Sequence, residues 1–230
     1  PYLPNKELSA YKMAGVDTDH EATTFEYALE EVRRGLHVHI REGSAAHNLK
    51  DIVEGIVRTG IDTEYFSFCT DDKHIEDILR DGHIDYSVKM AVKLGLDPIR
   101  AIKMATINTA KCYGLKHLGA ISPGFQADFV VLDNLTDLNV TDVFYKGKRL
   151  NEDAPIRVRP CSHVLKHTVH LDKVKAERFL LPISKKKTHV IEIHAGQITT
   201  TDLTISLPHT LNFEPFGGYS KIAAVERHHN

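Results

Sequence analysis

The fold of this chain is indicated most directly by one stretch, LHVHIREGS at residues 36–44. Apolar residues and histidines alternate from Leu36 to Ile40, which is the period of two expected of a β-strand. The strand is followed at once by the polar turn Arg41 to Ser44. A strand that ends in polar side chains is typical of the active-site edge of a parallel sheet.

Two similar runs lie on either side of this stretch. AGV at residues 14–16 is followed by the polar tip DTDH, and YFSFC at residues 65–69 is followed by TDD. The carboxyl ends of parallel strands meet at one edge of a sheet. We therefore expect His20, Glu42 and Asp71 to lie at the same edge.

Amphipathic helices are expected between these strands. Thr23 and Glu26 have the spacing of a capping box for a helix that runs to Arg34. A second helix ends at Gly60, and its apolar stripe consists of Leu49, Ile52, Val53, Ile56 and Val57. The alternation of strands and helices predicts βα units around a parallel sheet.

A helical region is expected from His74 to Gly114, where Asp97-Pro98 places an N-cap before a proline at the first helical position. Turns and short strands follow, at residues 119–121, 127–133 and 140–145, and residues 151–159 have the composition of a linker. We predict three segments: the last βα units of a barrel at 1–115, a β-sandwich module at 116–155, and an α+β domain at 156–230.

Composition bounds the classes of partner. The 230 residues carry 29 Lys and Arg against 31 Asp and Glu, so neither a nucleic acid nor a membrane surface is expected as a partner. Neither a long apolar run nor a secretory signal is evident, and the three scattered cysteines do not suggest a disulfide framework. These features favour a cytoplasmic protein, and they leave both small ligands and protein partners open.

Metal chemistry is suggested by His20 and Asp71. A neutral imidazole and a carboxylate at strand tips are ligands that zinc, manganese and iron accept. Taken alone, each residue is explained as readily by structure, since His20 suits a loop and Asp71 could cap a helix. Their occurrence at two corresponding strand ends makes the metal-binding interpretation the stronger one.

Several blocks of sequence resemble the microbial adenine deaminases of the amidohydrolase superfamily. They are GVDTDHE at 15–21, IREGSAA at 40–46, CTDD at 69–72 and GHID at 82–85. GAISPGFQADFVVLD at 119–133 is similar to the segment in which amidohydrolases leave the barrel for a β-sandwich. The resemblance implies an α/β fold, the C-terminal portion of a TIM-like (β/α)8 barrel with a β-sandwich module and an additional α+β domain.

The resemblance also implies an activity, the metal-dependent hydrolytic deamination of adenine to hypoxanthine and ammonia. His20 matches the metal-binding histidine of barrel strand 6, and Asp71 matches the strand 8 aspartate that binds metal and handles protons. A binuclear manganese or iron site is implied, with zinc as the alternative, in a homo-oligomer with a purine substrate. The remaining ligands should lie upstream, so we expect this chain to be part of a longer enzyme and inactive alone.

Other residues near the strand ends are candidates for subsidiary roles. Asp72 is a candidate catalytic residue that binds a second metal or holds its neighbour, although a helix N-cap explains it equally well. Gly43 allows a ligand to come close to the turn, so Arg41, Glu42 and Ser44 are candidates to offer hydrogen-bond donors and acceptors to a purine. His83, in the GHID turn, is a further candidate for contact with the substrate.

Structural explanations compete with these roles. A salt-bridged surface loop would account for the turn, and a hydrogen bond to the following helix would account for His83. We expect His37 and His39 to pack structurally, and Cys69 to be a buried filler rather than a nucleophile, because no catalytic partner pattern accompanies it.

Two other functions compete with adenine deamination. One is the hydrolysis of a cyclic amide, as in dihydroorotase or imidazolonepropionase relatives, which would use the same strand-tip ligands. The other is a non-catalytic assembly module. The turn from Arg41 to Ser44 is the feature that distinguishes the first from a purine deaminase.

Overall fold

The computed structural model describes residues 2–150, 160–166, 168–171 and 173–228, so the predicted linker at 151–159 lies outside the described residues. The chain divides into two compact units, residues 1–153 with 193–199, and residues 154–192 with 200–230. Each unit is described by itself.

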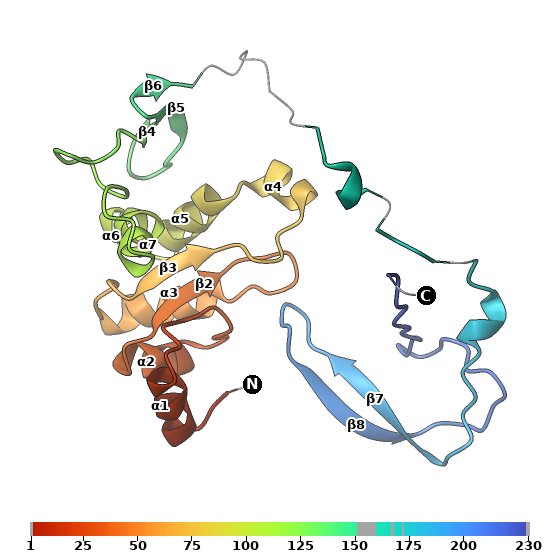
Figure 1. The fold of residues 1–230 in the computed structure, drawn as a ribbon. Coiled ribbons are helices and arrows are strands. Elements are labelled where there is room, and N and C mark those ends of the chain that lie inside the picture. The colour runs from red at the N-terminus through yellow and green to blue at the C-terminus, as the bar shows by residue number, and fades with distance from the viewer. Residues whose placement is uncertain (1, 151–159, 167, 172, 229–230) are drawn as a thin grey trace. The chain divides into compact units, whose positions relative to one another are not determined.

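A three-stranded parallel sheet forms the centre of the first unit (Figure 1). Its strands are β1 (Thr18–Asp19), β2 (His37–Arg41) and β3 (Phe66–Cys69), in the order β1-β2-β3. Asp19 pairs with Val38, and Arg41 pairs with Cys69. The predicted parallel βα arrangement is confirmed for these strands, and their carboxyl ends lie at one edge.

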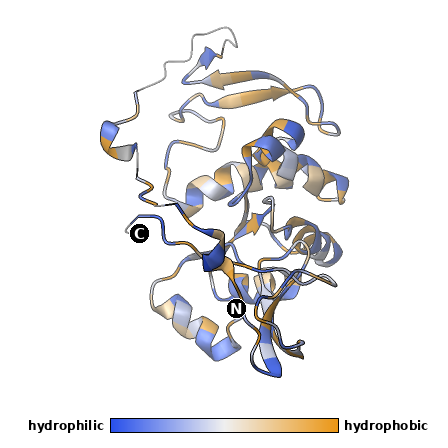
Figure 2. Cartoon of the chain, turned by 90° about the vertical axis from the view of Figure 1, so that its right-hand side faces the viewer, coloured by the Kyte–Doolittle hydropathy of each residue, from blue (hydrophilic) through white to orange (hydrophobic). Residues whose placement is uncertain are grey.

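Helices pack around this sheet, and their bounds are α1 (Asn5–Met13), α2 (Phe25–Arg33), α3 (Leu49–Thr59), α4 (Ile75–Asp81), α5 (Ile84–Lys93), α6 (Pro98–Ala105) and α7 (Ile107–Cys112). These helices contain both hydrophobic and hydrophilic residues (Figure 2), as expected of helices with one buried face. The shared core includes Val38 and Ile40 of β2, Phe66 of β3 and Ile52 of α3, all fully buried.

Local sequence signals explain most of these helix boundaries. Four residues of the predicted α3 stripe are fully buried, but Val57 is 39% exposed, so the stripe is narrower than predicted. Gly60 ends α3 in the left-handed conformation, with φ 69°, which glycine adopts without a steric penalty. The Asp97 side chain accepts a hydrogen bond from the backbone N–H of Arg100, which confirms the predicted N-cap.

Two predictions near the N-terminus were wrong. Residues 14–16 are not a strand, because helix α1 runs to Met13 and its end turns at Gly15, with φ 97°. The first strand is instead Thr18–Asp19, within the predicted polar tip. Helix α2 is capped by Thr24 rather than Thr23, since the Thr24 side chain accepts from the Tyr27 N–H.

A small antiparallel sheet follows the helices, with strands β4 (Phe129–Leu132), β5 (Val140–Tyr145) and β6 (Lys148–Arg149). It belongs to the same compact unit as the parallel sheet. Residues 119–121 are not a strand, contrary to prediction. Three strands do not make a sandwich, so the β-sandwich module remains a prediction.

The second unit contains β-structure and 3-10 turns. Strands β7 (Lys187–Ile193) and β8 (Thr200–Ser206) form a two-stranded sheet, preceded by 3-10 turns at His163–Leu165 and Ala176–Phe179. The described residues after 160 include no α-helix, so the helical component of the predicted α+β domain is not seen there. Within the described part of the chain, no helix is long and apolar enough to cross a membrane.

Candidate metal centre at the strand ends

Three side chains meet at the carboxyl edge of the parallel sheet. One ligand atom from each of His20, Glu21 and Asp71 lies within 4.8 Å of the other two. His20 and Glu21 directly follow β1, and Asp71 follows β3 after Thr70. One imidazole and two carboxylates are a donor set that fits zinc, manganese or iron. These three residues are the ones that would hold a divalent metal.

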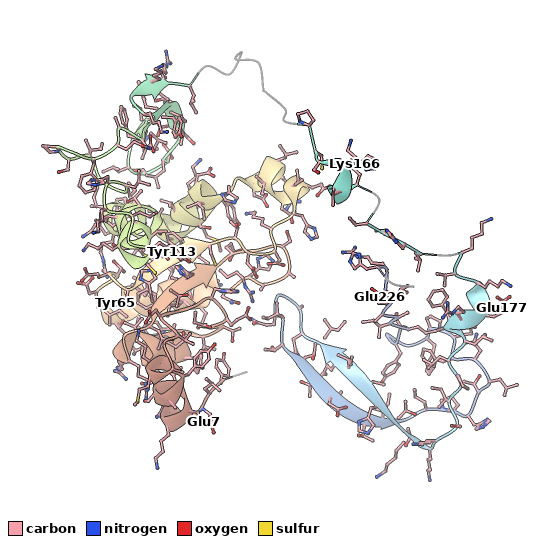
Figure 3. The ribbon with its side chains drawn as sticks, viewed as in Figure 1. Glu7, Tyr65, Tyr113, Lys166, Glu177 and Glu226 are labelled. Carbon is pink, nitrogen blue, oxygen red and sulfur yellow. The ribbon has the colours of Figure 1, made fainter. Side chains whose placement is uncertain are left out.

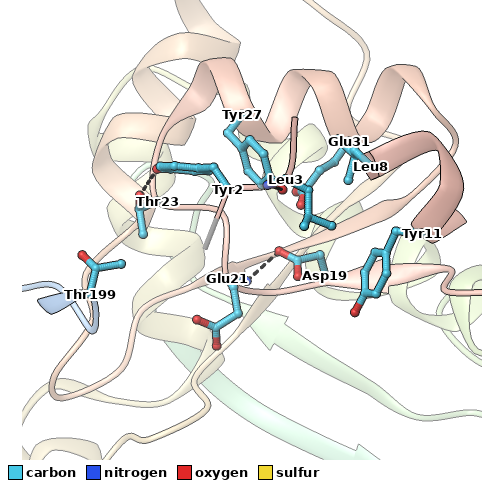
Figure 4. Close-up of a pocket in the computed structure, with 10 residues that line it drawn as sticks. All are labelled: Tyr2, Leu3, Leu8, Tyr11, Asp19, Glu21, Thr23, Tyr27, Glu31 and Thr199. Atoms are coloured by element: carbon cyan, nitrogen blue, oxygen red, sulfur yellow. Dashed lines mark hydrogen bonds between the residues drawn. The ribbon is translucent and has the colours of Figure 1, made fainter. Parts of the chain in front are cut away.

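The turn after β1 is fixed by the side chain of Asp19. Its Oδ2 accepts hydrogen bonds from the backbone N–H groups of Glu21 (2.7 Å) and Ala22 (3.0 Å), and Figure 4 marks the first of these. Ala22 is buried in the core, which anchors the far end of the turn. This local loop places the side chains of His20 and Glu21 beside each other, with His20 Nε2 3.3 Å from Glu21 Oε1.

Arg41 connects the two carboxylates of the cluster. Its side chain is only 2% exposed, and Nη1 donates to Asp71 Oδ2 (2.6 Å) and to Glu21 Oε1 (3.0 Å). A buried guanidinium requires such charged partners. Arg41 was predicted to contact substrate, but the structure places its charge against Asp71 and Glu21.

Asp71 has an unusual backbone conformation. Its φ of 45° lies in the left-handed region, which costs a residue with a Cβ about 1–2 kcal/mol. The turn closes around it through a hydrogen bond from the Lys73 N–H to the Thr70 carbonyl oxygen. Asp71 is therefore held in this conformation by its surroundings, which is common at functional sites.

A cavity with apolar and aromatic walls adjoins the cluster. It is lined by His20, His39, Phe68, Cys69, Thr70, Asp71, Ile84, Thr109 and Tyr113. Tyr113, labelled in Figure 3, stacks on the His39 ring and places its hydroxyl 3.0 Å from His39 Nε2. Apolar walls with a few convergent polar groups are typical of sites for small ligands.

The two histidines of β2 are buried behind the cluster. His37 Nε2 lies 3.0 Å from Ser67 Oγ, and His39 Nδ1 also bonds this hydroxyl. Burial, with a contribution from His39, lowers the pKa of His37 to about 4. Burial and the nearby His20 also lower the pKa of His39. Both are neutral at pH 7, which agrees with the packing role expected of them, although His39 also lines the cavity.

Cys69 is not suited to act as a nucleophile. Burial raises the pKa of its thiol to about 12, with Asp71 contributing in the same direction. Because the thiolate is the reactive form, a thiol with this pKa is inert near neutral pH.

The remaining predicted residues each have a partner outside the metal cluster. Glu42 is buried and bonds His47 Nδ1 (2.7 Å), and His83 Nε2 lies 3.1 Å from Thr70 Oγ1. Ser44 Oγ bonds Asp77, and Asp72 accepts from the backbone of the turn after β2. Among the described residues that line the cavity, none of these four is included.

Glu21 is the cluster residue that sequence reasoning missed. It stands next to His20 in the quoted GVDTDHE block, so a carboxylate beside the candidate ligand was the available signal.

A second carboxyl group, Glu31 on α2, is buried near Asp19. Burial, together with Asp19, raises the pKa of Glu31 to about 9, so it carries a proton at pH 7.

Comparisons of the sequence with known proteins agree on one family. Residues 5–150 match the model of the amidohydrolase family. The chain is 50% identical to the adenine deaminase of Desulfitobacterium hafniense (strain Y51), across 99% of this chain and 40% of that protein. It is 38% identical to the adenine deaminase of Petrotoga mobilis, across 99% of this chain and 41% of that protein.

Among solved structures, the β-aspartyl dipeptidase of Fervidobacterium islandicum AW-1 matches with a TM-score of 0.47 and 20% identity, over 63% of this chain and 41% of that one. The chain spans about 40% of the length of the curated relatives it matches.

Proposed function

The chain belongs to the amidohydrolase family, and from this premise we propose that the complete polypeptide deaminates adenine by hydrolysis. In this reaction water adds to C6, the bond from C6 to the exocyclic nitrogen breaks, and hypoxanthine and ammonia result. Two adenine deaminases that align with 99% of this chain support the choice of substrate. The observation that carries the proposal is the cluster of His20, Glu21 and Asp71 at the strand ends.

The three cluster residues are proposed to hold a divalent metal, manganese or iron in the first instance. When bound, such a metal supplies a water of lowered pKa that can attack near neutral pH. The Asp71 carboxylate is proposed to be the base that takes the proton from the attacking water. It then gives the proton to the exocyclic nitrogen, which leaves poorly unless it is protonated.

Arg41 is proposed to act on the reaction through Asp71 and Glu21. Its hydrogen bonds to both carboxylates place one fixed positive charge between Asp71 and Glu21. The guanidinium also restricts the rotation of both side chains. Direct contact with the purine is not required for this role.

Recognition of the purine is proposed to involve the cavity beside the cluster. Phe68, Ile84 and Tyr113 supply apolar and aromatic surface for a planar ring. The predicted contacts of Glu42 and His83 with the purine edge remain part of the proposal, whereas Ser44 is assigned a positioning role below. Each of them requires the side chain to exchange its present partner for the substrate.

The proposal is tested with the complete, metal-loaded protein by chromatographic measurement of the substrate consumed. Ammonia release is a second measurement for adenine alone, because opening the ring of a cyclic amide releases no ammonia. Adenine is compared with dihydroorotate and imidazolone propionate, which represent the cyclic-amide alternative. We expect turnover of adenine and none of the cyclic amides. Turnover of a cyclic amide in place of adenine would reassign the substrate, and the absence of any turnover would favour an assembly role.

A further inference from the structure

The loops that follow β2 and β3 are joined by side-chain hydrogen bonds. Asp72 Oδ2, from the loop after β3, accepts from the backbone N–H of Ala45 at 2.8 Å. Ser44 Oγ, from the loop after β2, accepts from the backbone N–H of His74 at 2.8 Å and donates to Asp77. Each loop therefore supplies a side chain that satisfies the backbone of the other.

Gly43 allows the two loops to come this close. A Cβ added at Gly43 would clash with Asp72 Oδ1 and would lie 3.0 Å from the Thr70 carbonyl oxygen. The Gly43 N–H donates to the Ala46 carbonyl oxygen at 2.9 Å, which closes the turn after β2 on itself. The small residue is thus needed because of a close approach between loops.

Asp72 is directed into this contact and away from the metal donors. Its Oδ2 bonds Ala45, whereas its Oδ1 is buried and has no hydrogen-bond partner among the described residues. Asp72 is not a member of the cluster formed by His20, Glu21 and Asp71 in the described part of the chain. It also does not cap α4, whose N-cap position is His74.

The segment held by these bonds includes Asp71. Asp71 lies directly before Asp72 and has the left-handed backbone with φ 45°. A left-handed residue with a Cβ relaxes unless its neighbours fix it. On one side the Asp71 carboxylate is held by Arg41, and on the other its backbone continues into Asp72 and His74, both bonded to the loop after β2.

We propose that Asp72 and Ser44 form a loop lock, two reciprocal side-chain-to-backbone hydrogen bonds that hold Asp71 in its left-handed turn and so aim its carboxylate at His20 and Glu21. Asp72 is then a positioning residue, in contrast to the catalytic role predicted from the sequence. Ser44 has the same role. The expected effect on turnover rests on the proposed deaminase function, but the lock itself is a statement about structure.

The test compares Asp72→Ala with Asp72→Asn in the complete, metal-loaded protein. Asparagine keeps an oxygen that can accept from Ala45, whereas alanine removes it. We expect Asp72→Ala to lower kcat for adenine by about 10²-fold, because small misplacements of a reacting group have effects of this size. Asp72→Asn should stay within about threefold of wild type, with bound metal per chain unchanged. Asp72→Ala should also lose part of its bound metal, because the lock positions Asp71, itself a proposed ligand, and KM should be unchanged in both variants.

Asp62→Ala is the matched control. Asp62 also accepts one hydrogen bond from a backbone N–H, that of Glu64 at 2.9 Å, but it lies outside both loops. It should leave kcat unchanged. Loss of bound metal in both Asp72→Asn and Asp72→Ala would identify Asp72 as a metal ligand and overturn the lock, as would an unchanged kcat in Asp72→Ala.

Ser44→Ala provides a second, milder variant in case Asp72→Ala does not fold. Both halves of the lock act on one segment, so the double variant Ser44→Ala/Asp72→Ala should lose less than the product of the two single losses. The same cycle measured on the thermal midpoint needs no substrate. If the thermal midpoints of the variants show coupling but the wild-type protein does not deaminate adenine, the lock is retained and the proposed function is rejected. Strict additivity in both measurements would reject the lock.

Discussion

Residues 2–114 and residues 160–228 use apolar residues differently. In residues 2–114, most apolar side chains of β2 and α3 are enclosed, and Val38, Ile40, Ile52 and Ile56 are all fully buried. In residues 160–228, Ile191 is 62% exposed and Ile222 is 85% exposed. The first segment contains both the strands and the helices that cover them, whereas the second has strands without an α-helix among its described residues.

This difference indicates which segment is able to hold side chains in fixed positions. A metal cluster needs side chains held within fractions of an ångström, which a packed sheet with helices on it provides. The candidate site accordingly lies at the ends of the strands of the parallel sheet. Substitutions in the first segment should therefore have larger effects than substitutions in the second segment or at exposed control positions.

The largest expected effect is on catalysis at Asp71. Asp71→Asn keeps the shape of the side chain but removes its basicity, so the proton transfer from water to the leaving nitrogen is lost. We expect kcat for adenine to fall by about 10³-fold, in the range typical of general acid–base groups. Steady-state ammonia release measures this, and Asp62→Asn, with its side chain in an exposed loop, should keep wild-type activity.

The next effect is on stability in the first segment. Ile52 is fully buried on α3, so Ile52→Ala should lower the free energy of unfolding by about 2–5 kcal/mol, through lost transfer energy and the cavity left behind. Denaturant unfolding of the complete protein measures this loss. An effect below about 0.5 kcal/mol would show that the core around α3 is not packed as described.

A pH effect is expected from His37. Its pKa is about 4 in the folded protein and 6.5 in the unfolded chain, so between these values the folded state binds fewer protons. The contribution of His37 to the free energy of unfolding should therefore be fully present above about pH 6.5. It should be lost as the pH drops toward 4, by about 3 kcal/mol in total. His39, whose pKa is lowered too, adds to the same slope.

The variant His37→Gln isolates the share of His37 in this slope. Thermal midpoints between pH 4.5 and 7 should vary less with pH in the variant than in wild type. An identical pH dependence in the two proteins would mean that His37 is not buried as a neutral side chain.

The smallest effect is expected in the second segment. Ile191→Ala on β7 removes the same atoms as Ile52→Ala, but from a side chain that is 62% exposed. We expect a loss of less than about 0.5 kcal/mol, as for most surface substitutions. A loss comparable to that of Ile52→Ala would show that Ile191 is covered in the complete protein and would remove the contrast between the segments.

Several of the predicted elements that were confirmed have a strong internal period. Strands β2 and β3 and helix α3 follow from alternation and from an apolar stripe. Strand β1 has only two residues, too few to show a period, and the sequence before it turns at Gly15. Short elements of this kind are fixed by pairing with a neighbour, here Asp19 with Val38, which no local pattern reveals.

The site was predicted in part for the same reason. His20 and Asp71 could be placed because each lies within two residues of the end of a strand, and parallel strands bring their ends together. The role of Arg41 could not be predicted, because it depends on contacts with Glu21 and Asp71, which are 20 and 30 positions away. The contact of Asp72 with Ala45, 27 positions away, was beyond local patterns too.

The claim that His20, Glu21 and Asp71 hold a divalent metal is tested most directly by the metal content of the complete protein. Elemental analysis after dialysis should find manganese, iron or zinc in wild type, and substantially less in the double variant His20→Ala/Asp71→Ala. The control Asp62→Ala should retain the full content. An unchanged metal content in the double variant would contradict the assignment of this cluster as a metal centre.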